Sequence, residues 1–118
     1  MKQKEIQNRT FEFAIRIVNL CRHLDEKPGV GRTIGRQLLR AGTSVGANVE
    51  EAQAGQSKAD FISKIAIALK EARETRYWVR LLVASNILPK ERLSNIQTEV
   101  EELMKVLGSI IVSAKDNK

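Results

Sequence analysis

The sequence is poor in the residues that build metal centres, disulfides and aromatic surfaces. It has one cysteine, Cys21, and one histidine, His23. These counts exclude an intramolecular disulfide, a zinc site with two or more thiolates, and a paired-histidine metal site. Aromatic residues make up 4% of the chain, too few for a typical β-sandwich or for a surface that stacks several bases.

Long apolar runs are also missing. No stretch approaches the ~18 uninterrupted apolar residues of a transmembrane helix, and the first residues lack the apolar centre of a signal peptide. We therefore expect a soluble, cytoplasmic protein with no membrane partner.

What the chain does contain is helical periodicity. Its 118 residues, 42% hydrophobic and 29% charged, predict one compact domain over residues 1–118. Pro28, Pro89 and a break at residues 55–57 divide it into four segments, at about 8–26, 30–54, 58–86 and 90–115. Such long segments predict an all-α, antiparallel up-down four-helix bundle.

Apolar residues in these segments recur at alternating spacings of four and three, which is typical of helices packed at a shallow angle. The third segment begins with a capping-box pattern from Ser57 to Asp60. Its predicted seam is Phe61, Ile65, Ala68, Ala72, Thr75, Val79 and Leu82. The predicted seam of the second segment is Ile34, Leu38, Ala41, Val45, Asn48 and Ala52.

Three glycines lie beside the second seam, at Gly35, Gly42 and Gly46. Glycine costs a helix interior about 1 kcal/mol relative to alanine. We expect that a neighbouring helix approaches closely there, with local looseness of the chain as the alternative.

One polar residue, Asn48, falls within the second seam. A buried amide needs a hydrogen-bond partner, so we expect a bond across the interior to Thr75, Glu71 or Glu74. The expected role of these four residues is structural, fixing the helix register.

Apolar side chains beyond the seams predict self-association. Phe11 and Ile15 give the first segment more apolar surface than one buried face needs. Tyr77, Trp78 and Leu81 project from the third segment on the side away from its seam. We predict that these residues form a homo-oligomer interface; the alternative is that a neighbouring helix of the same bundle covers them.

Catalytic groups are scarce. No second histidine can orient a base beside a nucleophile, and the Glu-x-x-His pairs of di-iron bundles are absent. We predict no enzymatic activity, no cofactor and no metal site.

The net charge is +6, and residues 1–48 alone carry +5. Arginines follow helical spacing, and their planar side chains suit phosphate. They predict a backbone-directed nucleic-acid surface, and an oligomer would multiply its charge; the alternative is a solvated face with ion pairs. The candidate residues are Arg9, Arg16, Arg32, Arg36, Arg40, Arg73, Arg76 and Arg80.

The run from Gln37 to Ala52, QLLRAGTSVGANVEEA, resembles the signature of the four-helix-bundle family named for proteins encoded in 23S ribosomal RNA intervening sequences. Asp60-Phe61, Lys70-Glu71-Ala72 and Tyr77-Trp78 fit the same family. The resemblance covers essentially the whole chain.

That resemblance implies a ring of subunits, typically a pentamer. It also implies kinship with the accessory variability determinant of diversity-generating retroelements, a basic pentamer that binds nucleic acid and a reverse transcriptase. The expected partners are therefore further copies of the chain, nucleic acid (RNA rather than DNA) and a reverse transcriptase. The alternative is a protein-interaction or structural oligomer with no direct nucleic-acid role.

Overall fold

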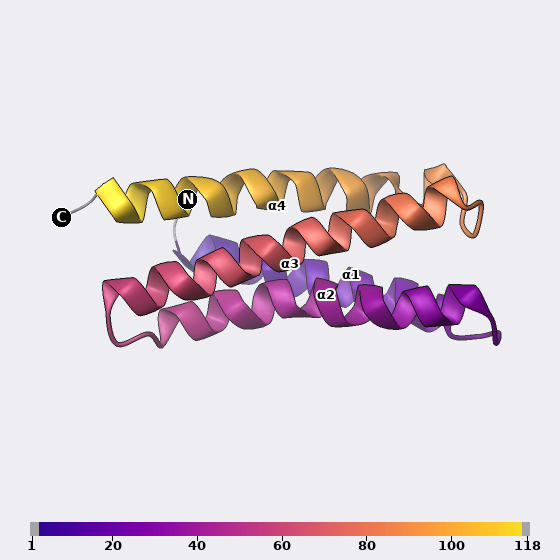
Figure 1. The fold of residues 1–118 in the computed structure, drawn as a ribbon, viewed down its shortest axis with the longest axis horizontal. Coiled ribbons are helices and arrows are strands. Elements are labelled where there is room, and N and C mark those ends of the chain that lie inside the picture. Colours follow the sequence, from indigo (N-terminus) through magenta and orange to yellow (C-terminus); the bar gives the residue numbers. More distant parts are fainter. Residues whose placement is uncertain (1–2, 117–118) are drawn as a thin grey trace.

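A computed structural model describes residues 3–116 and shows four long helices, with no strand among those residues. They are α1 (Gln3–Leu24), α2 (Val30–Gln53), α3 (Lys58–Ala84) and α4 (Lys90–Asp116). Successive helices run in opposite directions along one rod of 50 × 21 × 18 Å (Figure 1). The all-α prediction is confirmed, and residues 1–2 and 117–118 of the predicted domain lie outside the described range.

Three helices match their predicted bounds within two residues, but α1 does not. It was expected over 8–26 and instead spans Gln3–Leu24. The earlier start follows from Ile6, whose side chain is buried in the core and continues the apolar stripe of α1 by two turns. The earlier end fits Pro28, because a residue before proline is disfavoured in helical conformation.

Local signals account for the helix ends. The Ser57 hydroxyl accepts a hydrogen bond from the Asp60 backbone N–H at 3.0 Å, so the predicted N-cap of α3 is formed. Gly29 precedes α2 with a φ of 133°, a conformation that favours glycine. Asn86 takes a left-handed φ of 60° in the turn between α3 and α4, a conformation that asparagine tolerates better than most residues.

The predicted seam of α3 is buried from Ile65 to Leu82, and Phe61 at its outer end is half-buried. In α2 the first predicted seam residue, Ile34, is half-buried, and the prediction was wrong at Asn48, because Val49 occupies the core position assigned to it. Asn48 is half-buried and donates to the Ser44 backbone oxygen of its own helix at 2.8 Å. Spacings of four then three place Val49 after Val45 as well as they place Asn48, and burying the valine leaves no amide to satisfy.

Thr75 is fully buried and likewise bonds within its own helix, donating to the Glu71 backbone oxygen at 2.8 Å. The expected hydrogen bond across the interior from Asn48 is therefore not formed.

Glycines bring α1 and α2 together. A Cβ atom added at Gly42 would lie 2.8 Å from both Cγ atoms of Ile17, and one added at Gly46 would lie 3.1 Å from the Thr10 backbone oxygen. Contacts under 3.0 Å are essentially never seen for real Cβ atoms. The expected close approach is confirmed, and at Gly42 no side chain fits without a shift of Ile17.

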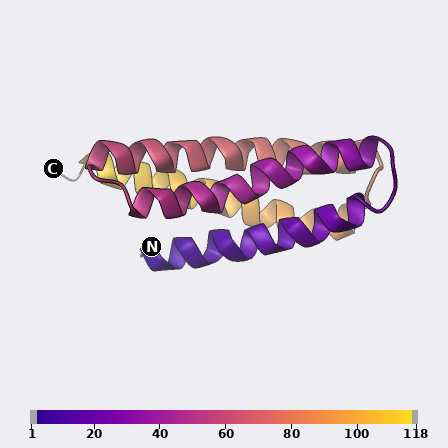
Figure 2. The ribbon, with the colours of Figure 1, turned by 90° about the horizontal axis from the view of Figure 1, so that it is seen from below.

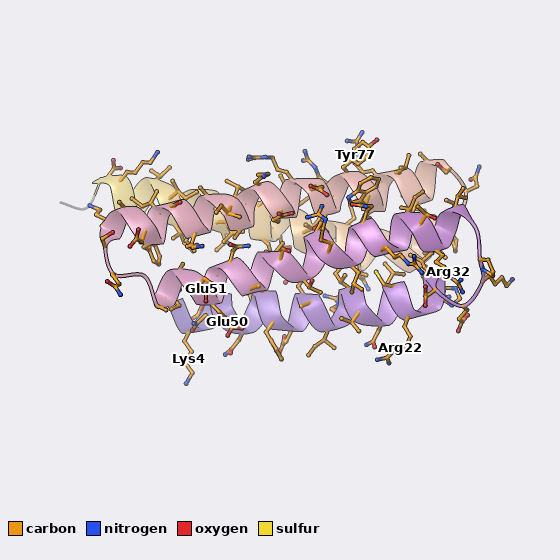
Figure 3. All side chains as sticks on the ribbon, turned by 60° about the horizontal axis from the view of Figure 1, so that its bottom comes forward. Lys4, Arg22, Arg32, Glu50, Glu51 and Tyr77 are labelled. Atoms are coloured by element: carbon orange, nitrogen blue, oxygen red, sulfur yellow. The ribbon has the colours of Figure 1, made fainter. Side chains whose placement is uncertain are left out.

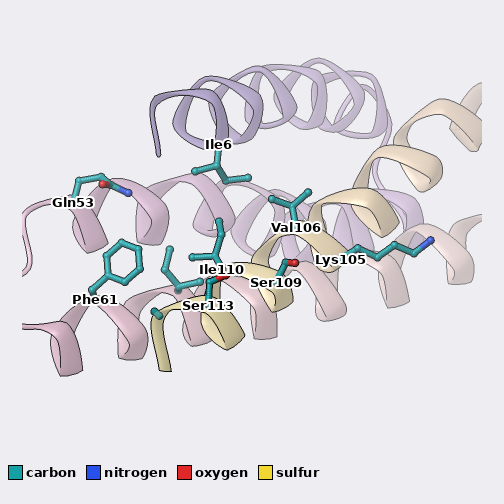
Figure 4. A pocket seen from close by; sticks show the side chains of 10 residues that line it. Ile6, Gln53, Phe61, Lys105, Val106, Ser109, Ile110 and Ser113 are labelled. Carbon is teal, nitrogen blue, oxygen red and sulfur yellow. The ribbon is translucent and has the colours of Figure 1, made fainter. Parts of the chain in front are cut away.

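The edge between α1 and α4 is much looser than the other three helix pairs. One ion-pair cluster spans it, in which Arg9 Nη2 lies 2.8 Å from Glu99 and 3.0 Å from Glu102. Figure 2 shows α1 and α4 from below. Near the beginning of α1 the loose packing leaves a groove of about 520 Å³, with Ile6, Phe61 and Ile110 among its lining residues (Figure 4).

Candidate nucleic-acid interface

Three of the eight candidate arginines are held by carboxylates of other segments. Arg9 joins the α4 glutamates Glu99 and Glu102. Arg32 lies 3.2 Å from the Asp25 carboxylate and also donates to the Asp25 backbone oxygen from Nε and Nη2, at 3.2 and 2.7 Å. These ion pairs hold the connection between α1 and α2 and the edge between α1 and α4.

Arg40 is the third paired arginine, and it links α2 to α3. Its guanidinium bonds to Glu71 at 3.3 Å and to Glu74. Glu74 also accepts the indole N–H of Trp78 at 3.1 Å. Glu71 and Glu74 are thus structural through their carboxylates, and their partner is Arg40 rather than Asn48.

The other five candidate arginines form no ion pair with any residue in the range 3–116. Arg16 lies on α1, Arg36 lies on α2 between the two paired arginines, and the rest lie on α3. The α2 row is thus split in its chemistry, whereas all three α3 arginines keep their hydrogen-bonding capacity. The members of this unpaired set are Arg16, Arg36, Arg73, Arg76 and Arg80.

Two of the α3 arginines line a groove against α4. Arg73 and Arg76 lie there with Lys105, Glu101 and the apolar Met104 in a hollow of about 440 Å³. Arg80 follows Arg76 one turn later along the same helix. Arg73, Arg76, Arg80 and Lys105 are called the α3 basic row below.

Lys105 was missed by the sequence reasoning because residues 90–118 are neutral overall. Two antiparallel helices joined by a turn near residue 88 place Lys105 opposite residues near 70. This register was the feature of the sequence that could have indicated Lys105. Arg22 was not among the candidates either, although it lies in the basic first part of the chain; it lines a hollow with Arg32 and Arg36 between α1 and α2. Figure 3 shows Arg22 and Arg32 at the same end of the bundle.

The residues expected at a subunit interface differ in exposure. Phe11 is 58% exposed, Ile15 47% and Tyr77 53%. Trp78 and Leu81 are half-buried, and Trp78 packs against the core of its own chain. The neighbouring-helix alternative therefore holds in part for Trp78, while Phe11, Ile15 and Tyr77 present open apolar surface.

The model of the 23S rRNA-intervening sequence protein family matches residues 2–109. The chain belongs to this family. The residues that carried the resemblance, from Gln37 to Trp78, all lie within the matched range.

A solved member-like structure supports the fold. It is a crystal structure of a protein of unknown function from the S23 ribosomal protein family of Bacteroides thetaiotaomicron VPI-5482. The two chains are 44% identical, with a TM-score of 0.84, over 90% of this chain and 97% of the other. A comparison with curated proteins returned no match.

In this family member, the Cys21 thiol and the His23 imidazole each have a partner within the chain. The Cys21 thiol is buried and donates to the Gly35 backbone oxygen at 3.3 Å, and burial raises its pKa to about 12. His23 lies 3.3 Å from the Glu26 carboxylate on the surface. Across residues 3–116, no three His, Cys, Asp or Glu side chains gather into a metal-binding group.

The helices of this family member also differ from membrane spans. No helix in the described part of the chain is both long enough and apolar enough to cross a bilayer.

Proposed function

We propose that this protein is a non-enzymatic, ring-forming module that binds the phosphate backbone of structured RNA through its α3 basic row. The observation that carries the proposal is that Arg73, Arg76 and Arg80 form no ion pair with a carboxylate among residues 3–116, unlike Arg9, Arg32 and Arg40. An arginine already paired loses that pair when it binds phosphate, whereas an unpaired one gains a charge-assisted bond.

The scarcity of free aromatic rings favours backbone contacts over base contacts. Trp78 is half-buried and bonded to Glu74, and Tyr77 packs edge-on against it with ring centroids 5.0 Å apart. Base recognition in single strands relies on stacking. RNA is preferred over DNA as the partner because of the family resemblance.

Exposed apolar side chains support assembly into a ring. Phe11 and Ile15 lie on α1, and Tyr77 lies on α3. Helices α1 and α3 do not pack on each other, so they occupy diagonal corners and their outer faces point apart. Two different faces per subunit are what a head-to-tail ring requires, and a ring of five would repeat the charge of +6 five times.

The decisive experiment measures RNA binding by fluorescence anisotropy across a salt series. We expect affinity to fall steeply with salt, because bound arginines release counterions from the phosphates. The double variant R73Q/R76Q should bind about tenfold or more weakly, at about 1 kcal/mol for each exposed contact, and with a smaller salt slope.

Two variants control for loss of charge. K115Q removes one positive charge from the last turn of α4 and should leave affinity within about twofold, because it lies outside the α3 basic row. R16Q removes an unpaired arginine from α1. Equal weakening by K115Q and R73Q would contradict a localised site, and unchanged binding by R73Q/R76Q would contradict the proposal.

The exposure of Phe11 favours a second candidate, a structural oligomer without a nucleic-acid role. In that case F11S should lower the mass measured by light scattering, while R73Q/R76Q leaves both the mass and every cellular function intact. Y77S tests the opposite face, and it is a sharper probe than a Trp78 variant because Trp78 also packs within its own chain.

The resemblance to the accessory variability determinant extends the proposal to a reverse transcriptase as protein partner. Co-purification with a reverse transcriptase encoded beside this gene would support that role. Its failure would leave the RNA-binding proposal standing, since the two depend on different partners.

A further inference from the structure

A hollow of about 330 Å³ lies between α1 and α2, on a different pair of helices from the α3 basic row. This volume falls within the ~300–1,000 Å³ of small-molecule sites. Its lining combines three guanidiniums with apolar side chains, whereas the hollow beside the α3 basic row contains two guanidiniums and Lys105.

The floor is formed where the two helices lie close together. Gly35 is buried there, and a Cβ atom at this position would meet Leu24 at 3.1 Å. Cys21 contributes to the floor from α1, and its thiol donates to the Gly35 backbone oxygen. Val18 on α1 and the 38% exposed Leu39 on α2 add apolar surface.

The charged groups around the hollow are not equivalent. Asp25 and Arg32 neutralise each other in an ion pair at 3.2 Å. Arg22 and Arg36 make no ion pair within the described residues, so the hollow keeps two net positive charges on two different helices. A ligand with two negative charges would complement them.

We propose that this hollow binds a nucleoside monophosphate, with the phosphate between Arg22 and Arg36 and the base against Val18 and Leu39. Two guanidiniums match a phosphate dianion by forked hydrogen bonds. The ion-paired Arg32 also lines the hollow. The nucleoside monophosphate has two possible sources, a free mononucleotide or the 5′-phosphorylated end of an RNA strand, and both present the same chemistry. The proposal does not rest on RNA binding by the α3 basic row.

Calorimetric titration with AMP tests the site. We expect one saturable site per chain, with adenosine and inorganic phosphate each binding at least about tenfold more weakly, since each supplies half of the contacts. R22Q and R36Q should each weaken AMP binding about tenfold, as loss of a charged hydrogen bond does. L39S should also weaken AMP while leaving the weak binding of inorganic phosphate unchanged.

R73Q/R76Q is the matched control, because it removes two unpaired arginines from the other pair of helices. It should leave AMP affinity unchanged even if it abolishes RNA binding, so the two proposals fail separately. Because Arg22 and Arg36 are exposed, their variants should retain the wild-type circular dichroism spectrum. AMP-induced amide shifts should centre on residues 18–22 and 35–39.

Comparison of a short 5′-phosphorylated RNA with its 5′-hydroxyl form separates the two sources. A preference for the phosphorylated strand over AMP assigns the hollow to a chain end, and the reverse preference assigns it to a free nucleotide. Phosphate binding as tight as AMP binding, or AMP affinity unchanged in both R22Q and R36Q, would overturn the proposal.

Discussion

Helix α1 packs against α2 and against α4 in contrasting ways. Against α2, glycines at 42 and 46 let the backbones approach until Ile17 and the Thr10 carbonyl occupy the space of missing side chains. Against α4, contacts are few and a partly buried ion-pair cluster around Arg9 spans the gap. One helix is thus fixed by shape on one side and by charge on the other, so the two sides should respond to different perturbations.

The largest expected effect is at the tightly packed interface between α1 and α2. G42A should lower the free energy of unfolding by about 1–2 kcal/mol, because overpacking costs about 1–3 kcal/mol and alanine's better helix propensity offsets up to ~1 kcal/mol. Urea denaturation followed by circular dichroism measures it.

Ile17 provides the test of mechanism. I17A should cost less in the G42A background than in the wild-type chain, because the smaller side chain removes the clash. Strict additivity in this double-mutant cycle would mean that Gly42 and Ile17 do not compete for the same space.

At the loosely packed edge between α1 and α4, R9Q should lower the free energy of unfolding by up to about 1 kcal/mol, since the Arg9–Glu99 ion pair is only partly shielded from solvent. The two glutamates hold the pKa of Arg9 above its usual range. The loss of stability in R9Q should shrink in high salt, because salt screens the ion pair, whereas the loss in G42A should not depend on salt. R16Q is the control: Arg16 lies on the same helix and forms no ion pair within the described part of the chain, so this variant should be nearly neutral.

A glycine on α4 sharpens the contrast. Nothing lies within 4 Å of a Cβ atom built at Gly108. G108A should therefore stabilise the chain by about 0.5–1 kcal/mol through helix propensity alone. A destabilising G108A would show that glycine on α4 is also required by packing.

The buried thiol of the tightly packed interface between α1 and α2 adds a pH dependence. Burial raises the pKa of Cys21 to about 12, so the folded chain keeps this proton at pH values where the unfolded chain, with an ordinary thiol pKa of about 8.5, loses it. The unfolded state then binds fewer protons, and stability falls as pH rises above about 9. The stability of the C21A variant, measured by thermal unfolding, should fall less steeply over the same pH range.

The sequence predicted the helices and most of the core because both follow from local periodicity. It misplaced one core position of α2, where spacing alone allows Asn48 or Val49 and only packing chooses between them. It missed the first turns of α1, because the burial of Ile6 depends on contacts with distant segments.

The sequence predicted which arginines form the basic surface. It did not predict which of them are in ion pairs and which can bind phosphate. Arg36, Arg40 and Arg73 look alike along the chain, yet among the described residues only Arg40 of these three forms ion pairs with glutamates of a neighbouring helix. That distinction requires the register between α2 and α3. The pairing of Arg9 with Glu99 requires in addition that the first and last helices be adjacent.

The loose packing between α1 and α4 also affects how the chain folds. Its tight interfaces join helices that follow one another along the chain, so each forms by closing a short turn at small entropic cost. The molecule should therefore fold rapidly as three successive hairpins, with the first and last helices meeting at the end. By the same logic that edge should open first, and the amides early in α1 should exchange with solvent ahead of those in α2 and α3.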